Sequence, residues 1–307
     1  MKLFNLLVAI LFITQIGSGL LGNLFLLCYY ISALLSGHRL RPIDTIFVNL
    51  AFANLKVLLS KGLPQTMFFL GMKNFLDPFC CNLIHYLQHL SRSVSLSTTC
   101  LLSGFQVIAI SASNSRWSEL KAQATKYIVH SCLFCWCFYL LINLTMLGIM
   151  HNSRFKSNNT RWWHLGYCSV AAPASFNTTF YGIIFSLPDF ICMAFMIWAS
   201  VYLIFLLHRH HQRVKHIHNL HISPGYFPEI RATHAILLLV CTYVSFYSID
   251  SILSFSVFQF GKYESFLLPI AQFMTTCFPT ISPFILISYD SQGHRNWRNL
   301  WSKKSSQ

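Results

Sequence analysis

The chain is short of charged residues, and acidic residues are the scarcest of them. Charged residues make up 10% of the 307 residues, and Asp and Glu together number 8. Soluble domains usually carry charge on about a quarter of their residues, so this composition excludes an ordinary soluble domain. Only Asp189 and Asp250 lie deep in apolar sequence, and an enzyme site would need a richer cluster, so we expect no catalytic activity.

Apolar residues take the place of charge. They make up 54% of the chain and gather in seven long stretches at about 3–35, 43–71, 81–111, 126–150, 179–207, 232–258 and 265–288. A helix needs roughly 20 residues to cross a hydrocarbon core about 30 Å thick, and lipid offers no hydrogen-bond partner to an open backbone. The sequence therefore predicts an all-α membrane protein in which residues 1–307 form a single seven-transmembrane-helix bundle.

The net charge of +14 comes from basic residues that lie mostly outside the apolar stretches, with three inside them, and form no continuous basic domain. We therefore expect membrane lipid, and not nucleic acid, as a partner. Cytoplasmic connections are enriched in Lys and Arg, and one set of alternate connections carries 13 of these residues against 6 in the other. This bias predicts a multi-pass protein of the plasma membrane with its N-terminus extracellular and its C-terminus cytoplasmic.

Both ends of the chain carry a membrane signal. The small residues at 17–19 are compatible with a cleaved signal peptide, but apolar sequence continues to Leu35, so we predict an uncleaved first helix. Near the C-terminus, Trp297, Leu300 and Trp301 recur at helical spacing among basic residues. This pattern is typical of a short amphipathic helix that lies on the membrane surface.

Three of the 11 cysteines lie outside the apolar stretches or at their outer boundary, namely Cys80, Cys81 and Cys168. On the predicted topology they meet an oxidising compartment, so a disulfide should join the third stretch to an outer loop. The residues alone leave the choice between Cys80 and Cys81 open. The same loop carries N-glycosylation acceptor patterns at Asn158 and Asn177, which agrees with its placement outside.

A stripe of polar residues runs along the third apolar stretch. Inside a membrane such a stripe must face protein or water, since an unpaired charge there costs at least roughly 2.5 to 3.5 kcal/mol. The spacings of 3, 1, 3, 3 and 4 residues place the stripe on about one third of a helix circumference. It consists of His85, Gln88, His89, Arg92, Ser95 and Thr99.

Two interpretations of the stripe stay open. In one, Arg92 pairs with a buried acid, Asp189 or Asp250, and holds helices together. In the other, the stripe lines a water-accessible outer cavity that binds a small ligand, for which an anionic group would suit. Both hold if the ligand displaces a carboxylate from Arg92. The candidate ligand-binding residues are His85, Gln88, His89, Arg92, Ser95, Asp189 and Asp250.

The connection between the fifth and sixth stretches, at 208–221, is basic and rich in histidine. Histidines can bind zinc, but no Cys or carboxylate ligands accompany them. A continuation of the fifth helix that faces anionic lipid head groups explains the segment as well. We therefore predict no metal and no cofactor, and retinal is excluded because the seventh stretch has no lysine for a Schiff base.

Four regions of the chain carry recognisable motifs, namely STTCLLS at 97–103, WAS at 198–200 with HRHHQRVKHIH at 208–218, RAT at 231–233, and CFPTISPF at 277–284. Together these motifs resemble those of the type 1 vomeronasal receptors, which are rhodopsin-like seven-helix pheromone receptors. The resemblance aligns Cys81, rather than Cys80, with the bridged cysteine, and so favours a disulfide with Cys168.

The resemblance implies a G-protein-coupled chemosensory receptor that binds a small, pheromone-like molecule and activates a heterotrimeric G protein of the inhibitory class. Gln106 stands in a Phe-Gln-Val run that replaces the Asp-Arg-Tyr triplet of the wider superfamily. Bitter-taste receptors are the nearest alternative, but the cysteine pair and the His-Arg-His segment argue against them. A transporter or channel is more distant, since no inverted halves are evident. The candidate G-protein contacts are Gln106, Arg116, Arg209, Arg213, Lys215 and Arg231.

Overall fold

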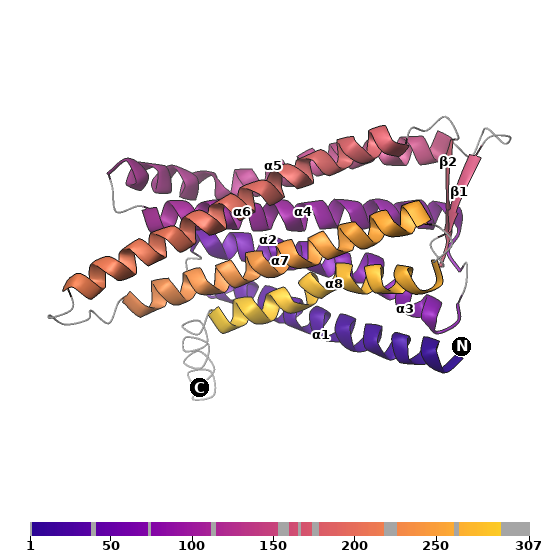
Figure 1. The fold of residues 1–307 in the computed structure, drawn as a ribbon, viewed down its shortest axis with the longest axis horizontal. Coiled ribbons are helices and arrows are strands. Elements are labelled where there is room, and N and C mark those ends of the chain that lie inside the picture. The colour runs from indigo at the N-terminus through magenta and orange to yellow at the C-terminus, as the bar shows by residue number, and fades with distance from the viewer. Residues whose placement is uncertain are drawn as a thin grey trace.

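The computed structural model describes residues 2–37, 41–72, 75–111, 115–152, 160–164, 167–173, 178–217, 226–260 and 264–289. Within these ranges it has seven helices that are long and apolar enough to cross a membrane, and Figure 1 shows them running along the long axis of the molecule. The predicted seven-helix membrane bundle is therefore confirmed. The predicted C-terminal amphipathic helix, together with Asn158 and Asn177, lies outside the described residues.

The helical elements extend past most of the predicted stretches, because hydropathy locates only the apolar part of a helix. The second span is made of three elements in succession, α2, η1 and α3, of which η1 is a π-helix. Much of the histidine-rich segment continues the fifth span, as one interpretation of it required. In chain order the elements are α1 (Lys2–Leu35), α2 (Pro42–Val57), η1 (Leu58–Gly62), α3 (Leu63–Phe69), α4 (Pro78–Ser111), α5 (Ser115–Asn152), α6 (Thr178–Ile217), α7 (Tyr226–Phe260) and α8 (Glu264–Tyr289).

A short β-hairpin, which the sequence did not predict, lies at one end of the bundle. Strands β1 (Thr160–His164) and β2 (Ser169–Pro173) pair in antiparallel fashion. A disulfide joins Cys81, in the first turn of α4, to Cys168, just before β2, and Cys80 is a free cysteine. The structure therefore forms the pair that the family resemblance favoured. Figure 1 places the hairpin at the end of the bundle where α1 begins.

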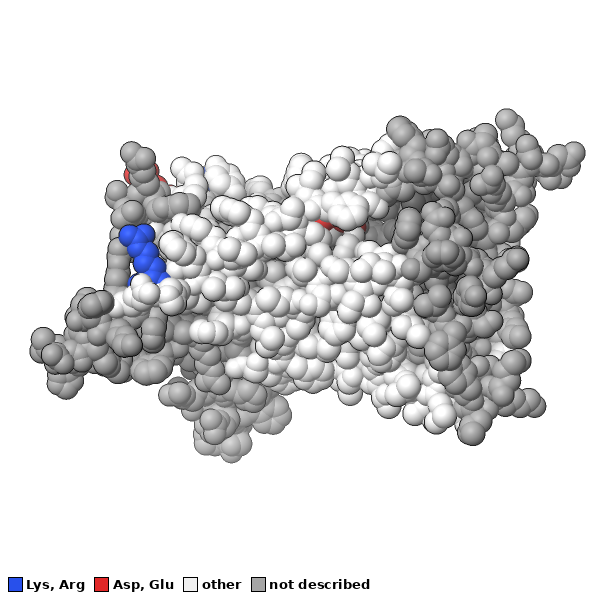
Figure 2. Space-filling model, in the orientation of Figure 1, with Lys and Arg blue, Asp and Glu red and all other residues white. Residues whose placement is uncertain are grey.

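The outward faces of the helices are apolar. Large apolar side chains are strongly exposed there, among them Leu21 at 72% and Phe134 at 68%. Figure 2 shows one face whose middle is almost free of charged residues, with Lys and Arg side chains at the end opposite the hairpin. Exposed apolar surface of this extent marks a region that contacts membrane.

The second span changes from α-helix to π-helix shortly before a proline. Pro64 has no N–H, so it cannot donate to the carbonyl of Ser60 one helical turn earlier. Gln88 of α4 supplies the missing donor, because its Nε2 lies 2.7 Å from that carbonyl oxygen. A side-chain hydrogen bond therefore links the irregular turn of η1, in the second span, to the third span.

Helix α1 packs closely on α8 through small residues and one amide. Asn23 Nδ2 donates to the carbonyl of Pro279 at 2.8 Å, a group that Pro283 cannot satisfy because it has no N–H. Gly22 lies against Pro283, where an added Cβ would stand 2.9 Å from the proline ring. The two prolines of the CFPTISPF motif therefore form part of the surface of α8 against which α1 packs.

The close packing of α1 on α8 predicts that Gly19→Ala lowers the free energy of unfolding by about 1–3 kcal/mol, as overpacking typically does. A Cβ at Gly19 would stand 2.8 Å from Thr280 Oγ1 and 3.1 Å from Thr280 Cα, so the backbone would have to move. Gly17→Ala is the matched control, since nothing lies within 4 Å of a Cβ there. The thermal midpoints of the purified variants in detergent measure the effect, and equal midpoints would contradict the packing of α1 on α8.

Candidate functional site

Arg92 of α4 forms an ion pair inside the bundle. Its Nη1 lies 2.9 Å from Oδ2 of Asp250 in α7, and its guanidinium stacks on Tyr247, with Cζ 4.5 Å from the ring centroid. The Asp250 side chain is 3% exposed, whereas that of Arg92 is 26% exposed. Arg92 is therefore neutralised by a buried acid, as one interpretation of the polar stripe required, without being sealed off.

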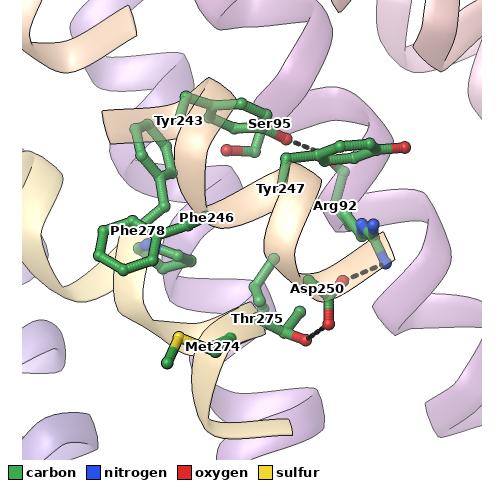
Figure 3. Close-up of a pocket in the computed structure, with 11 residues that line it drawn as sticks. Arg92, Ser95, Tyr243, Phe246, Tyr247, Asp250, Met274, Thr275 and Phe278 are labelled. Atoms are coloured by element: carbon green, nitrogen blue, oxygen red, sulfur yellow. Dashed lines mark hydrogen bonds and ion pairs between the residues drawn. The ribbon is translucent and has the colours of Figure 1, made fainter. Parts of the chain in front are cut away.

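Hydrogen bonds extend this ion pair in two directions. In α8, Thr275 Oγ1 donates to Asp250 Oδ1 at 2.5 Å (Figure 3), and Lys61 Nζ in η1 donates to Thr275 Oγ1 at 2.6 Å. On the other side, the Tyr247 hydroxyl donates to Asp189 Oδ2 in α6 at 2.8 Å. One polar network therefore joins η1, α4, α6, α7 and α8.

Sequence reasoning did not place Lys61, Tyr247 or Thr275 in the site. Lys61 carried a signal, because it is one of three basic residues inside the apolar stretches, where a charge is expensive unless it is paired. Tyr and Thr carry no such mark, since both are ordinary residues in membrane-spanning helices. Their roles depend on neighbours that only the packing of helices brings near.

A cavity of about 900 Å³ lies beside the network. Helices α4, α5, α6 and α7 all contribute to its wall, and the lining residues include His89, Arg92, Asn143, Asp189 and Tyr247. Sites for small organic molecules commonly measure roughly 300–1,000 Å³ and combine an apolar wall with a few polar groups. The cavity has the size and the polar groups of such a site.

A second cavity, of about 30 Å³, lies on the other side of the ion pair and is lined by Arg92, Ser95 and Asp250 among others (Figure 3). It is large enough for a water molecule but not for an organic ligand. Ser95 Oγ donates to Asn54 Oδ1 at 2.8 Å, and Asn54 Nδ2 donates to Ser282 Oγ at 2.9 Å. Ser95 thus joins α4 to α2 and α8.

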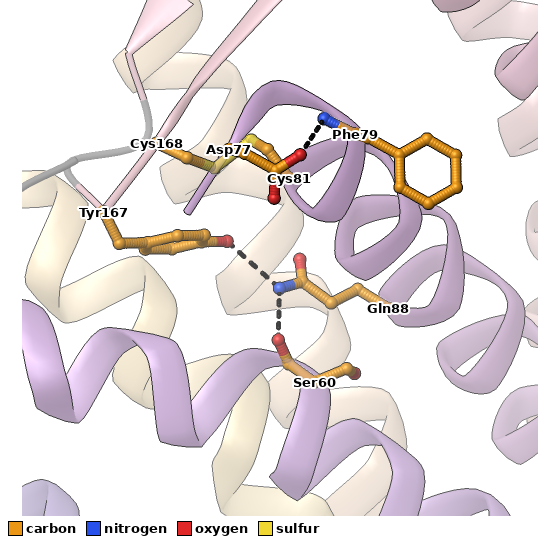
Figure 4. Close-up of a disulfide and its surroundings, with 7 residues drawn as sticks. All are labelled: Ser60, Asp77, Phe79, Cys81, Gln88, Tyr167 and Cys168. Atoms are coloured by element: carbon orange, nitrogen blue, oxygen red, sulfur yellow. Dashed lines mark hydrogen bonds between the residues drawn. A yellow bond between two sulfur atoms is a disulfide. The ribbon is translucent and has the colours of Figure 1, made fainter. Parts of the chain in front are cut away.

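Gln88 takes part in a contact at the hairpin end of the bundle (Figure 4). Besides its bond to the carbonyl of Ser60, its Nε2 donates to the Tyr167 hydroxyl at 3.1 Å. Tyr167 precedes the disulfide-bonded Cys168, and burial raises the pKa of its phenol, which therefore stays neutral at physiological pH. Gln88 connects the second span, the third span and the hairpin loop.

The seven predicted ligand-binding residues are distinguished by the cavity that they line. The large cavity is lined by His89, Arg92 and Asp189, the small one by Arg92, Ser95 and Asp250, and neither by His85 or Gln88. Gln88 instead contacts Ser60 and Tyr167, and the ring of His85 packs on that of His89 with 4.6 Å between centroids.

At the opposite end of the bundle, Gln106 is buried and donates from Nε2 to Thr233 Oγ1 of α7 at 3.1 Å. Arg209 is exposed on α6. Within the described part of the chain, no three His, Cys, Asp or Glu side chains are grouped as metal ligands would be. The other candidate G-protein contacts have side chains outside the described set, namely Arg116, Arg213, Lys215 and Arg231.

Comparison with known proteins agrees with this architecture. Residues 6–299 match the model of the vomeronasal organ pheromone receptor family. The chain is 39% identical to human vomeronasal type-1 receptor 4 over 283 residues, which cover 92% of this chain and 94% of the relative. It is also 39% identical to human vomeronasal type-1 receptor 1 (91% and 79% covered), and 29% identical to olfactory receptor class A-like protein 1 of Danio rerio (90% and 87% covered). The chain therefore belongs to the vomeronasal type 1 receptor family.

Proposed function

We propose that this protein is a G-protein-coupled chemosensory receptor that binds a small, pheromone-like molecule in the cavity of about 900 Å³. The observation that carries the proposal is the position of Arg92, which lines this cavity while it holds α4 to α7. The description of the matched family, as pheromone receptors of the vomeronasal organ, supports the same conclusion.

The chemistry of the cavity favours an uncharged polar group on the ligand. The sequence had suggested an anion for Arg92. Asp250 already neutralises Arg92 at 2.9 Å, and Asp189 adds a second carboxylate to the cavity wall. An anion would have to displace Asp250, whereas a carbonyl or hydroxyl oxygen could use the guanidinium N–H groups outside the ion pair.

The polar network gives ligand binding a route to the other end of the receptor. A ligand that competes for Arg92 alters its contacts with Asp250 and Tyr247, and both of these belong to α7. The same helix holds Thr233, the partner of Gln106, about 25 Å further along at 1.5 Å per residue. The ligand shifts the balance between two packings by its difference in affinity for them, and G-protein binding must raise ligand affinity by the same factor.

The orientation that we propose places the hairpin end outside the cell and the opposite end against a heterotrimeric G protein of the inhibitory class. The disulfide supports this orientation, because such bonds persist in oxidising compartments. The excess of Lys and Arg in the connections at the opposite end supports it too. The inner contact that we propose consists of Arg116, Arg209, Arg213, Lys215 and Arg231, with Gln106 buried behind them in this packing.

The test is a cellular reporter for inhibitory-class G proteins, with neutral and charged volatile and steroidal compounds applied to cells that express the receptor. We expect neutral compounds to give responses that disappear when the inhibitory α subunits are ADP-ribosylated. Charge reversal at Arg209, Arg213 and Lys215 should abolish the response at equal surface expression, whereas Lys73→Glu, in a connection at the other end, should preserve it. A response that survives reversal of all inner basic residues would refute this coupling surface.

A further inference from the structure

We propose that the ligand enters the large cavity from the lipid bilayer, between α6 and α7, and that it is an uncharged apolar molecule whose hydroxyl or N–H group donates to Asp189. This inference rests on the proposed function and deepens it, because it names the route and the chemical class of the ligand for the same cavity. Three features of the described residues lead to it.

The first feature is the depth of the cavity. Among the described lining residues, Ser186 and Ile252 lie nearest to the hairpin end of their helices. Ser186 is 8 residues from Thr178, where α6 begins, and Ile252 is 8 residues from Phe260, where α7 ends. At 1.5 Å per residue this is about 12 Å. The described lining residues therefore all lie at least about 12 Å along their helices from the hairpin end, and within the candidate membrane spans.

The second feature is a wall that is open toward the side of the bundle. Phe190 and Ile197 of α6 and Ile252 of α7 line the cavity, yet they are 63%, 50% and 66% exposed. Apolar side chains so exposed at this depth face acyl chains. Figure 2 shows a small acidic area recessed in the apolar face, at the position that Figure 1 gives to the space between α6 and α7.

The third feature is a carboxylate in the cavity wall, one oxygen of which makes no hydrogen bond in this packing. Asp189 is 7% exposed, and its Oδ2 accepts from the Tyr247 hydroxyl. Its Oδ1 makes no hydrogen bond among the described residues, although a buried acceptor without a donor is unfavourable. Ser93 and Tyr139, whose hydroxyl-bearing side chains interact with the same carboxylate, line the same cavity, so a donor on the ligand competes with them for Asp189. An uncharged alcohol or amide supplies such a donor and can also dissolve among acyl chains, which exclude charged groups.

A photoreactive probe tests the ligand class without any signalling readout. The probe is a long-chain alcohol with a diazirine, dissolved in vesicles that hold the purified receptor, and its methyl ether is the matched control. We expect the alcohol to label the peptides at 186–197 and 247–252 about tenfold more than the ether, as loss of a hydrogen bond to a charged group implies. Asp189→Leu should bring labelling by the alcohol down to that of the ether. If the leucine variant does not fold, Asp189→Asn serves in its place, because it keeps the shape of the side chain and one neutral oxygen. Its labelling by the alcohol should lie between that of the unaltered receptor and that by the ether.

A pair of tryptophan variants tests the route. Ile252→Trp narrows the opening, whereas Ile191→Trp adds the same bulk to a lipid-facing position of α6 that is 62% exposed and is not among the described lining residues. Vesicles that hold each variant are mixed with probe-loaded vesicles and photolysed after increasing delays. Ile252→Trp should slow the rate of labelling at least about fivefold, because it lowers the association rate. Ile191→Trp should leave the rate unchanged.

Equal labelling by the alcohol and the ether, or an unchanged rate in Ile252→Trp, would overturn this inference. Such a result, together with an intact G-protein response to small molecules, would leave the proposed function standing. Conversely, labelling as expected with no G-protein response to any compound would overturn the proposed function and keep the lipid-facing cavity.

Discussion

Replacing Arg92 by glutamine is expected to remove most of the folded receptor from the cell surface and to abolish the ligand response of what is left. Asp250, whose side chain is 3% exposed, would lose the cation that lies 2.9 Å away. Removal of one partner from a buried ion pair costs about 3–5 kcal/mol, a large part of the roughly 5–15 kcal/mol that holds a typical domain folded. Surface staining and the thermal midpoint in detergent measure the loss.

The double variant Arg92→Gln, Asp250→Asn separates folding from recognition. It leaves no unpaired charge at positions 92 and 250, so we expect it to recover part of the surface expression that the single variant loses. Recovery is incomplete because Lys61 keeps its hydrogen bond to Thr275 but loses the carboxylate of Asp250 from its network. If Arg92 recognises the ligand, the double variant should reach the surface and still fail to respond. A normal response from it would show that Arg92 only holds α4 to α7, and that recognition lies elsewhere in the cavity.

Cys81→Ser is expected to lower stability by about 2–5 kcal/mol, the usual effect of losing a native disulfide. The bond with Cys168 closes a segment of 87 residues, and it anchors the loop that carries Tyr167. Cys168→Ser should have the same effect, and the double variant should add little to either, because both changes remove one bond. Surface expression and thermal midpoints again give the readout.

Cys80→Ser is the matched control for this disulfide. Cys80 is adjacent in sequence and is a free cysteine, so its replacement should leave expression and stability unchanged. A loss in Cys80→Ser equal to that in Cys81→Ser would mean that the two cysteines exchange as partners of Cys168. Counting free thiols on the unfolded, unreduced protein gives an independent check, because Cys81→Ser should expose one additional thiol at Cys168.

The membrane class and the number of spans could be predicted because hydropathy acts locally along the chain. Each stretch must satisfy its own backbone hydrogen bonds in lipid, whatever its neighbours are. The bounds were less accurate where polar residues continue a helix, as in α5, which begins at Ser115 and not near 126. The β-hairpin was missed, since ten strand residues between two long apolar stretches carry little periodic signal of their own.

The candidate site was predicted in part. The period of the polar residues in α4 showed that His89 and Arg92 share one face, and both line the large cavity. Gln88 lies near that face too, yet it donates to Ser60 and Tyr167. Its role follows from Pro64, whose missing N–H leaves a carbonyl free on a different helix. Periodicity within one helix gives no account of what a neighbouring helix needs.

Hydropathy and charge are thus enough to establish that the chain spans the membrane seven times and that a polar stripe in the third span must be shielded from lipid, because the cost of polar groups in hydrocarbon depends only on the residues of each span. The choice of Asp250 over Asp189 as the ion-pair partner, and the link from Lys61 to Thr275 across 214 residues, arise in the folded bundle. So does the cavity. These features depend on which helices touch and how each is rotated about its axis, and that is determined by side-chain packing between residues that lie far apart in the chain.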